Sequence, residues 1–256
     1  MTTPITRLTT ALEDPRVAHS DFRHVPATHG NGWVTLVGVV HDHPASVFRV
    51  VETLTELEPD TVALEIAPVA IPLFHQLARD QGTDPETGLP ESSGGGEMSA
   101  AIGAAGDAHV VGIDLPNRAS LKTMFEAIRH ESLSARRALR AGHAFGVQAL
   151  HAVHCRVSHV ASKIGIDIDP KLDPRSDTST RTESPDAQAA EEDAAVAAGT
   201  TLLRAFSRPP AMEAFDRARE AAMADELRTH RQDGSNVVAV VGYAHLNPIL
   251  ERLEHE

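Results

Sequence analysis

Two histidines occur in the same short pattern, each at or just after the end of an apolar run. Gly38-Val-Val-His41 and Gly242-Tyr-Ala-His245 both read G-x-x-H. In an open α/β sheet the carboxyl ends of parallel strands meet at one edge, where such folds bind ligands. A glycine before each histidine lets the chain turn sharply or pass close to a bound group. The pattern therefore predicts that His41 and His245 face one crevice.

Two glutamates could share this crevice. Glu65 lies in the apolar segment 61–66, and Glu97 follows three glycines at the expected start of a helix. An unpaired carboxylate is costly to bury, so Glu65 requires a cation, a metal or a proton.

Two histidines and two carboxylates are a suitable ligand set for a divalent metal ion with an open position for water. Manganese, cobalt and zinc are all plausible ions, and one of the two glutamates could act as general base rather than ligand. The alternative is structural. In that case His41 and His245 cap neighbouring helices and Glu65 pairs with a buried arginine.

The elements that must position these residues are those of an α/β fold. Apolar segments at 21–25 and 33–40, with Asn31-Gly32 between them, predict an N-terminal β-hairpin. The helical pattern after Pro44 and the segment 61–66 complete a β-α-β unit, for which a parallel pair with a right-handed crossover is the default.

Further along the chain, the periodicity predicts a mainly parallel central sheet flanked by helices, with a helical insertion in the middle. We predict strands at 109–114 and 237–242, a loop at 81–96, and helices at 68–79, 97–107, 120–130, 133–164, 194–205, 210–230 and 247–253. The acidic segment 167–192 is interpreted as a flexible surface segment or linker, and whether it covers the crevice is left open.

Composition narrows the class of protein. The chain has 256 residues, with 36 acidic and 23 basic side chains and a net charge of −13, and we interpret 1–256 as a single domain. Without a cluster of basic residues, it is not expected to bind nucleic acid. The lone Cys155 excludes an internal disulfide framework.

No apolar run approaches the ~18 residues of a membrane span and no signal peptide is evident, so a cytoplasmic protein is expected. Abundant acidic side chains with little lysine are typical of proteins from high-salt cytoplasms.

Several weak motifs occur in a recognisable order. They are 37–41, Glu58-Pro-Asp60 leading to Glu65, Gly96-Glu97-Met98, Gly112-Ile-Asp114, Arg219 through Met223-Ala224, and 240–246. On these motifs the chain resembles the TraB family, whose relatives include Tiki-type proteases, erythromycin esterases and ChaN-like proteins. The likeness covers roughly 33–114 and 211–256, and the middle is matched only in its helical character.

The resemblance implies an α/β domain in which His41, Glu65, Glu97 and His245 line one pocket. Arg219 falls on the arginine of the family's R-x-x-x-M-A helix. Two departures are evident: Leu115 stands where relatives often have an arginine, and the membrane helices that follow the domain in many relatives are not found here.

The expected function is a metal-dependent hydrolase of peptide, ester or amide bonds, acting on a peptide or small-molecule substrate. His41 and His245 would be metal ligands, Glu65 or Glu97 a ligand or the base, and Arg219 the oxyanion-stabilising group or a structural partner of Glu65. The alternative is a non-catalytic binding or regulatory module that sequesters a peptide or small-molecule signal. The sequence leaves both the enzyme assignment and the oligomeric state open.

Overall fold

The central element is one mixed five-stranded sheet with the strand order β1-β2-β5-β3-β4. The computed structural model describes residues 6, 8, 13–26, 32–80, 82, 95–114, 184–205 and 210–255. The strands are β1 (Phe22–Val25), β2 (Val34–Val39), β3 (Thr61–Leu64), β4 (His109–Gly112) and β5 (Val237–Gly242). Among the described strands, only the β1–β2 pair is antiparallel, so the predicted mainly parallel sheet is confirmed.

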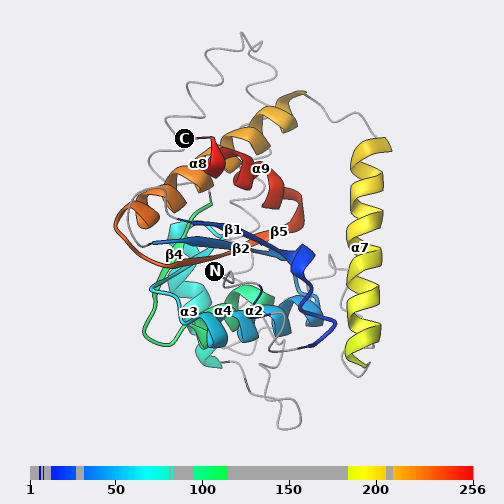
Figure 1. Ribbon diagram of the computed structural model, residues 1–256, viewed down its shortest axis with the longest axis horizontal. Coiled ribbons are helices and arrows are strands. Elements are labelled where there is room, and N and C mark those ends of the chain that lie inside the picture. The colour runs from blue at the N-terminus through cyan, green and yellow to red at the C-terminus, as the bar shows by residue number, and fades with distance from the viewer. Residues whose placement is uncertain are drawn as a thin grey trace, which may run out of the picture.

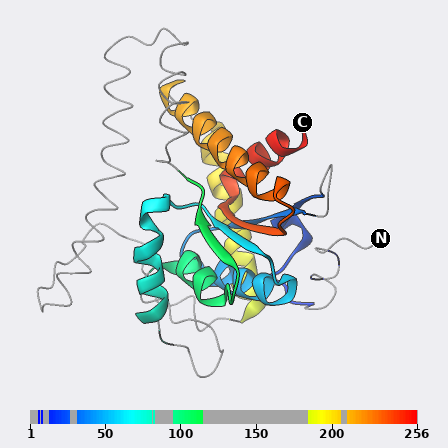
Figure 2. The ribbon, with the colours of Figure 1, turned by 90° about the vertical axis from the view of Figure 1, so that its left-hand side faces the viewer.

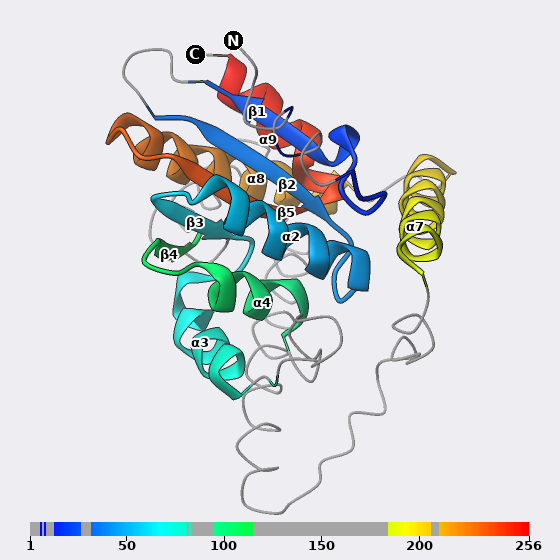
Figure 3. The same ribbon diagram turned by 60° about the horizontal axis from the view of Figure 1, so that its bottom comes forward.

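Helices cover both faces of this sheet (Figures 1 and 2). One layer holds α2 (Pro44–Leu57), α3 (Ile71–Asp80) and α4 (Gly96–Ala104), with the short 3-10 helix η2 (Pro68–Ala70) before α3. The opposite layer holds α8 (Pro210–Gln232) and α9 (Tyr243–Glu254). Another 3-10 helix, η1 (His19–Asp21), leads into β1, and α7 (Pro185–Ala205) stands to one side against α2 (Figure 3).

The core alternates along each strand, as strand geometry requires. In β2, Val37 and Val39 pack with α2 and α4, whereas Val34 and Leu36 pack with α8 and α9. Every residue of β2, β3 and β5 is buried, which explains why these segments are apolar except for Thr35 and Thr61. In the part of the chain that the structure describes, we find no helix with the length and apolar character needed to cross a bilayer.

The predicted hairpin and the helix after Pro44 are both present, and Val25 pairs with Val34 across the hairpin. The default β-α-β pairing is not what forms, however. β2 and β3 are parallel, but β5 lies between them and bonds to both. β3 ends at Leu64, so Glu65 follows the strand and does not lie within it.

The predicted acidic linker is helical over its last residues. α7 begins at Pro185, upstream of the predicted start at 194, because Ser184 accepts a hydrogen bond from the backbone N–H of Ala187 and so caps the helix. Proline also suits the first helical position. Residues 167–183 and the predicted helices at 120–130 and 133–164 lie outside the described residues.

Candidate functional site

The candidate site lies where the carboxyl ends of the parallel strands meet. Val39 of β2 pairs with Gly242 of β5, and Leu64 of β3 pairs with Val240 of β5. His41, Glu65 and His245 each follow one of these strands within three residues. The sheet therefore delivers three of the predicted side chains to one edge, and α4 and α8 contribute Glu97 and Arg219.

Glu97 fixes the ring of His41. Its carboxylate is buried at the start of α4, with Oε1 2.6 Å from His41 Nδ1, and its Oε2 accepts the backbone N–H of Asp42 at 2.9 Å. The chain reaches this contact because Asp42 adopts a left-handed φ of 61°. Gly96 is required beside it, since a Cβ on Gly96 would stand 2.2 Å from Asp42 Oδ1.

His41 is a half-exposed imidazole that carries a proton at neutral pH. The hydrogen bond to Glu97 outweighs burial and, with the charges of Glu97 and Glu65, raises the pKa of His41 to about 9. The side chain is 57% exposed. Its Nε2 lies 3.4 Å, and Glu65 Oε2 lies 3.5 Å, from the point that a Cβ on Gly242 would occupy. The missing side chain of Gly242 thus leaves a gap bordered by His41 and Glu65.

Arg219 supplies the cation that the buried Glu65 needs. Its Nε and Nη2 donate to both oxygens of Asp114 at 2.9 and 2.8 Å, and Nη2 also lies 2.8 Å from Glu65 Oε1. The other oxygen of Glu65 accepts the Gly242 N–H at 2.7 Å. Burial alone lowers the pKa of Arg219, but the hydrogen bonds and charges of Asp114 and Glu65 raise it above its ordinary value.

His245 is the mostly buried counterpart of His41. Its Nδ1 lies 3.1 Å from Glu220 Oε1, and its Nε2 lies 3.3 Å from Arg219 Nη1 and 3.5 Å from Glu65 Oε1. Burial and Arg219 lower the pKa of His245, whereas Glu220 and Glu65 raise it, and the net direction is upward.

The sequence prediction missed two carboxylates of this cluster. Asp114 was noted only as part of the TraB-like motif, although it lies just beyond the end of β4, as Glu65 does beyond β3. The same strand-end reasoning could have assigned it to the site. One feature of the sequence could have pointed to Glu220, namely its position next to Arg219.

The fit to a metal ion depends on where the donor atoms point. Each histidine turns Nδ1 toward a carboxylate, as metal-bound histidines usually do. This leaves Nε2 of His41 for a ligand, whereas Nε2 of His245 faces Nη1 of Arg219. Glu97, however, is engaged by His41 and Asp42, and the charge beside Glu65 and His245 is the guanidinium of Arg219. Across the described residues, no three His, Cys, Asp or Glu side chains gather in a geometry that could hold a metal. This arrangement therefore does not assemble the predicted four-ligand centre.

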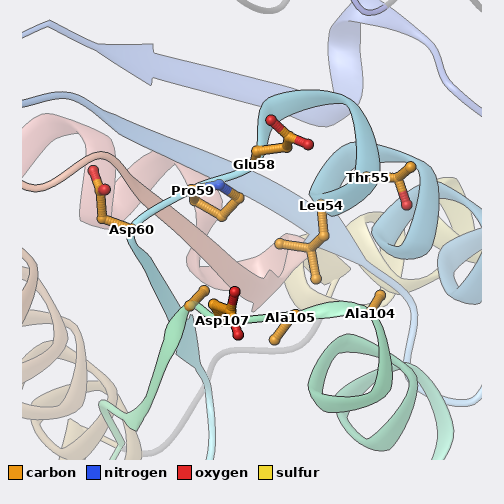
Figure 4. A pocket seen from close by; sticks show the side chains of 10 residues that line it. Leu54, Thr55, Glu58, Pro59, Asp60, Ala104, Ala105 and Asp107 are labelled. Atoms are coloured by element: carbon orange, nitrogen blue, oxygen red, sulfur yellow. The ribbon is translucent and has the colours of Figure 1, made fainter.

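A separate pocket lies at the opposite end of the strands (Figure 4). It is lined by Leu54, Thr55, Glu58, Pro59, Asp60, Ala104, Ala105, Gly106, Asp107 and Ala108. Asp60 directly precedes β3, so the pocket adjoins the amino-terminal end of the sheet. Its ionisable lining groups are carboxylates, and none of the predicted site residues reaches it. The strand-end cluster is therefore the better candidate for chemistry.

Comparisons with known proteins add no relative to this picture. No protein-family model, curated protein or solved structure matches the chain. The resemblance to the TraB family accordingly remains a prediction based on the motifs quoted above. What the strand-end cluster can do has to be inferred from its own geometry.

Proposed function

We propose that this protein is a hydrolase of peptide, ester or amide bonds, with His41 as its proton donor. The observation that supports this is the His41–Glu97 pair, in which a buried carboxylate holds a half-exposed, protonated imidazole. Glu65, Arg219 and His245 are mostly buried, so His41 is the group that meets a substrate. The substrate would be a peptide or small molecule and the place of action the cytoplasm.

Hydrolysis requires a proton for the leaving group and a base for the attacking water. The imidazolium of His41 can donate from Nε2 while Glu97 stabilises its charge through Nδ1. Of the two predicted bases, Glu97 is engaged by His41 and the Asp42 N–H. Glu65 also accepts hydrogen bonds, from Arg219 and the Gly242 N–H, but its Oε2 borders the same gap above Gly242 as His41 Nε2. This position assigns the attacking water to Glu65 in the proposal.

Arg219 acts in this proposal as the structural partner of Glu65. Its Nε and Nη2 already donate to Asp114 and Glu65. A guanidinium held by two carboxylates fixes the orientation of Glu65 and neutralises charge in the buried cluster. This supports the structural alternative for Arg219 over an oxyanion-stabilising role.

Turnover is tested with chromogenic peptides, esters and anilides, comparing the unmodified protein with His41→Gln. General acid catalysis typically contributes about 100-fold or more, so His41→Gln should lose at least that factor. The matched control is His255→Gln, an exposed histidine that follows α9. Equal rates for His41→Gln and the unmodified protein would overturn the proposal.

The predicted divalent metal is a separate proposal with its own measurement. The metal content of purified protein is determined by elemental mass spectrometry, beside the His41→Ala/His245→Ala double variant, after incubation with manganese, cobalt or zinc. Near-stoichiometric metal that the double variant loses would support a metal-dependent hydrolase. No uptake by either protein would count against it and leave the acid–base form.

A second candidate, a binding module that sequesters a peptide or small-molecule signal, is supported by the pairing around Arg219. Both oxygens of Glu65 accept hydrogen bonds from the protein itself, and Arg219 holds Asp114 by two further hydrogen bonds. Such a satisfied cluster suits a rigid binding surface. Saturable binding of a substrate-panel compound without any product on long incubation would favour this function over hydrolysis.

A further inference from the structure

A second charged cluster lies buried beside the candidate site, centred on Arg49 of α2. This side chain is 2% exposed. Its Nε lies 2.9 Å from Asp21 Oδ2, its Nη1 donates to the carbonyl oxygen of Gly38 at 2.9 Å, and its guanidinium also pairs with the carboxylate of Glu192. We call these residues, with Ser46 and Tyr243, the Arg49 network.

The Arg49 network touches both histidine-bearing segments. On the first, Arg49 holds the Gly38 carbonyl, and Ser46 Oγ accepts the N–H of Val40 at 2.8 Å while donating to Glu192. Val40 directly precedes His41. On the second segment, the hydroxyl of Tyr243 donates to Asp21 Oδ1 at 2.6 Å. The backbone that leads into His41 is thus fixed at two points by groups that contact Glu192.

Glu192 comes from α7, which is joined to the rest of the fold by polar contacts. Over its described side chains, the buried residues of α7 are Gln188 and Glu192, one turn apart on the same face. Gln188 accepts a hydrogen bond from Arg16 at 3.3 Å, and Glu192 enters the Arg49 network. Figures 1 and 3 show α7 lying outside the layered body, next to α2. Among the described side chains of this helix, little apolar surface is buried, and Glu192 is its main link to the site.

The position of Glu192 also suits the start of α2. The first turn of that helix has no acidic residue of its own, and Ser46, which bonds to Glu192, lies in it. Exposed N–H groups and the helix dipole favour a negative charge at this end. Without Glu192, Arg49 would keep a single buried carboxylate partner, Asp21. A buried charge that loses a partner drives local rearrangement.

We propose that Glu192 is a positioning residue for His41, supplied by α7 through the Arg49 network. Its catalytic consequence rests on the proposed hydrolase, but the positioning of His41 can be observed without any substrate. Glu192 reaches the His41 segment through Ser46 and Arg49, whereas it reaches Tyr243 only through Arg49 and Asp21. Removing the charge of Glu192 should therefore affect His41 more strongly than His245.

The test compares Glu192→Gln with Glu191→Gln, which makes the same charge change at the exposed neighbouring position of α7. Ring ¹⁵N–¹H spectra of the full chain report on His41 and His245, each assigned by its His→Gln variant. We expect Glu192→Gln to move the His41 signals more than those of His245, and to lower turnover by about 100-fold if positioning is lost. Glu191→Gln should leave the spectra and turnover unchanged.

A second variant keeps the proposal falsifiable if Glu192→Gln does not fold. Ser46→Ala retains the Arg49–Glu192 pair and removes only the bridge to the Val40 N–H, so it should also move the His41 signals. Unchanged His41 signals in the folded variants would overturn the positioning role even where the unmodified protein hydrolyses its substrate. Shifted signals in a protein that hydrolyses nothing would support positioning and count against the hydrolase alone.

Discussion

The two G-x-x-H segments share a pattern and an edge of the sheet, yet they present their histidines differently. After β2, α2 begins only at Pro44, so His41 lies in the turn before it and its side chain is 57% exposed. After β5, α9 begins at once with Tyr243, so His245 lies in the first helical turn and is 13% exposed. A single difference in where the next helix starts therefore separates an exposed histidine from a mostly buried one.

Each histidine also receives its carboxylate from a different layer. His41 bonds to Glu97 of α4, on one face of the sheet, whereas His245 bonds to Glu220 of α8, on the other. Arg219 stands only on the His245 side, where it opposes protonation. The comparison teaches that a strand end fixes the place of a side chain, while its exposure and charge come from the helices packed around it.

The largest effect on stability is expected on the His245 side of the cluster, from Arg219→Ala. This change leaves Asp114 and Glu65 buried without their cation, and breaking such a pair typically costs about 3–5 kcal/mol of unfolding free energy. Urea unfolding followed by circular dichroism measures it. Arg217→Ala is the control, because Arg217 is half-exposed and should change stability by about 0.5 kcal/mol or less. Similar losses for the two variants would refute a structural role for Arg219.

An intermediate effect should distinguish the glycines of the two motifs. A Cβ on Gly38 would stand 2.9 Å from two ring carbons of Tyr243, so Gly38→Ala should cost about 1–3 kcal/mol. A Cβ on Gly242 would meet His41 Nε2 and Glu65 Oε2 at 3.4 and 3.5 Å, an ordinary contact. Gly242→Ala should therefore fold normally and lose turnover, because it fills the gap between acid and base. Thermal unfolding and the substrate panel together check this, and a normally active Gly242→Ala would contradict it.

The smallest effect is a dependence of stability on pH, and it is expected at the exposed histidine, His41. The pKa of His41 is raised from 6.5 to about 9, so the stability that its protonated form contributes is complete below about pH 6.5 and is lost as the pH rises through about 9. An NMR titration of the His41 ring measures this pKa. Glu97→Gln should bring it back toward 6.5 or lower, since burial then acts without the carboxylate. A His41 that titrates near 6.5 in the unmodified protein would show that the Glu97 contact is not formed in solution.

Much of the fold follows from local sequence. Nearly continuous apolar runs predicted strands buried on both faces, and Pro44 marked the start of α2. The order of the strands in the sheet could not be predicted from local sequence. A β-α-β unit places its two strands side by side by default, but another strand of the chain can compete for the same edges. Here β5 bonds to both β2 and β3, a choice made by packing across the whole chain.

The site was predictable to the extent that strand ends and charge requirements determine it. Glu65 was expected to need a cation, a metal or a proton, and it pairs with Arg219. Glu192 could not be singled out, because Glu191 and Asp193 flank it and only tertiary burial distinguishes it from them. The early start of α7 was encoded in Ser184-Pro185, but the polar composition around it favoured a linker.

The central place of β5 has a consequence for how the chain is made. Residues 237–242 are synthesised long after residues 34–39 and 61–64, yet they bond to both of those strands. Until they emerge from the ribosome, β2 and β3 lack their shared partner and keep open edges that can pair with other chains. These late, long-range contacts also slow folding. Until β5 is made, the nascent chain is therefore prone to aggregation and dependent on chaperones.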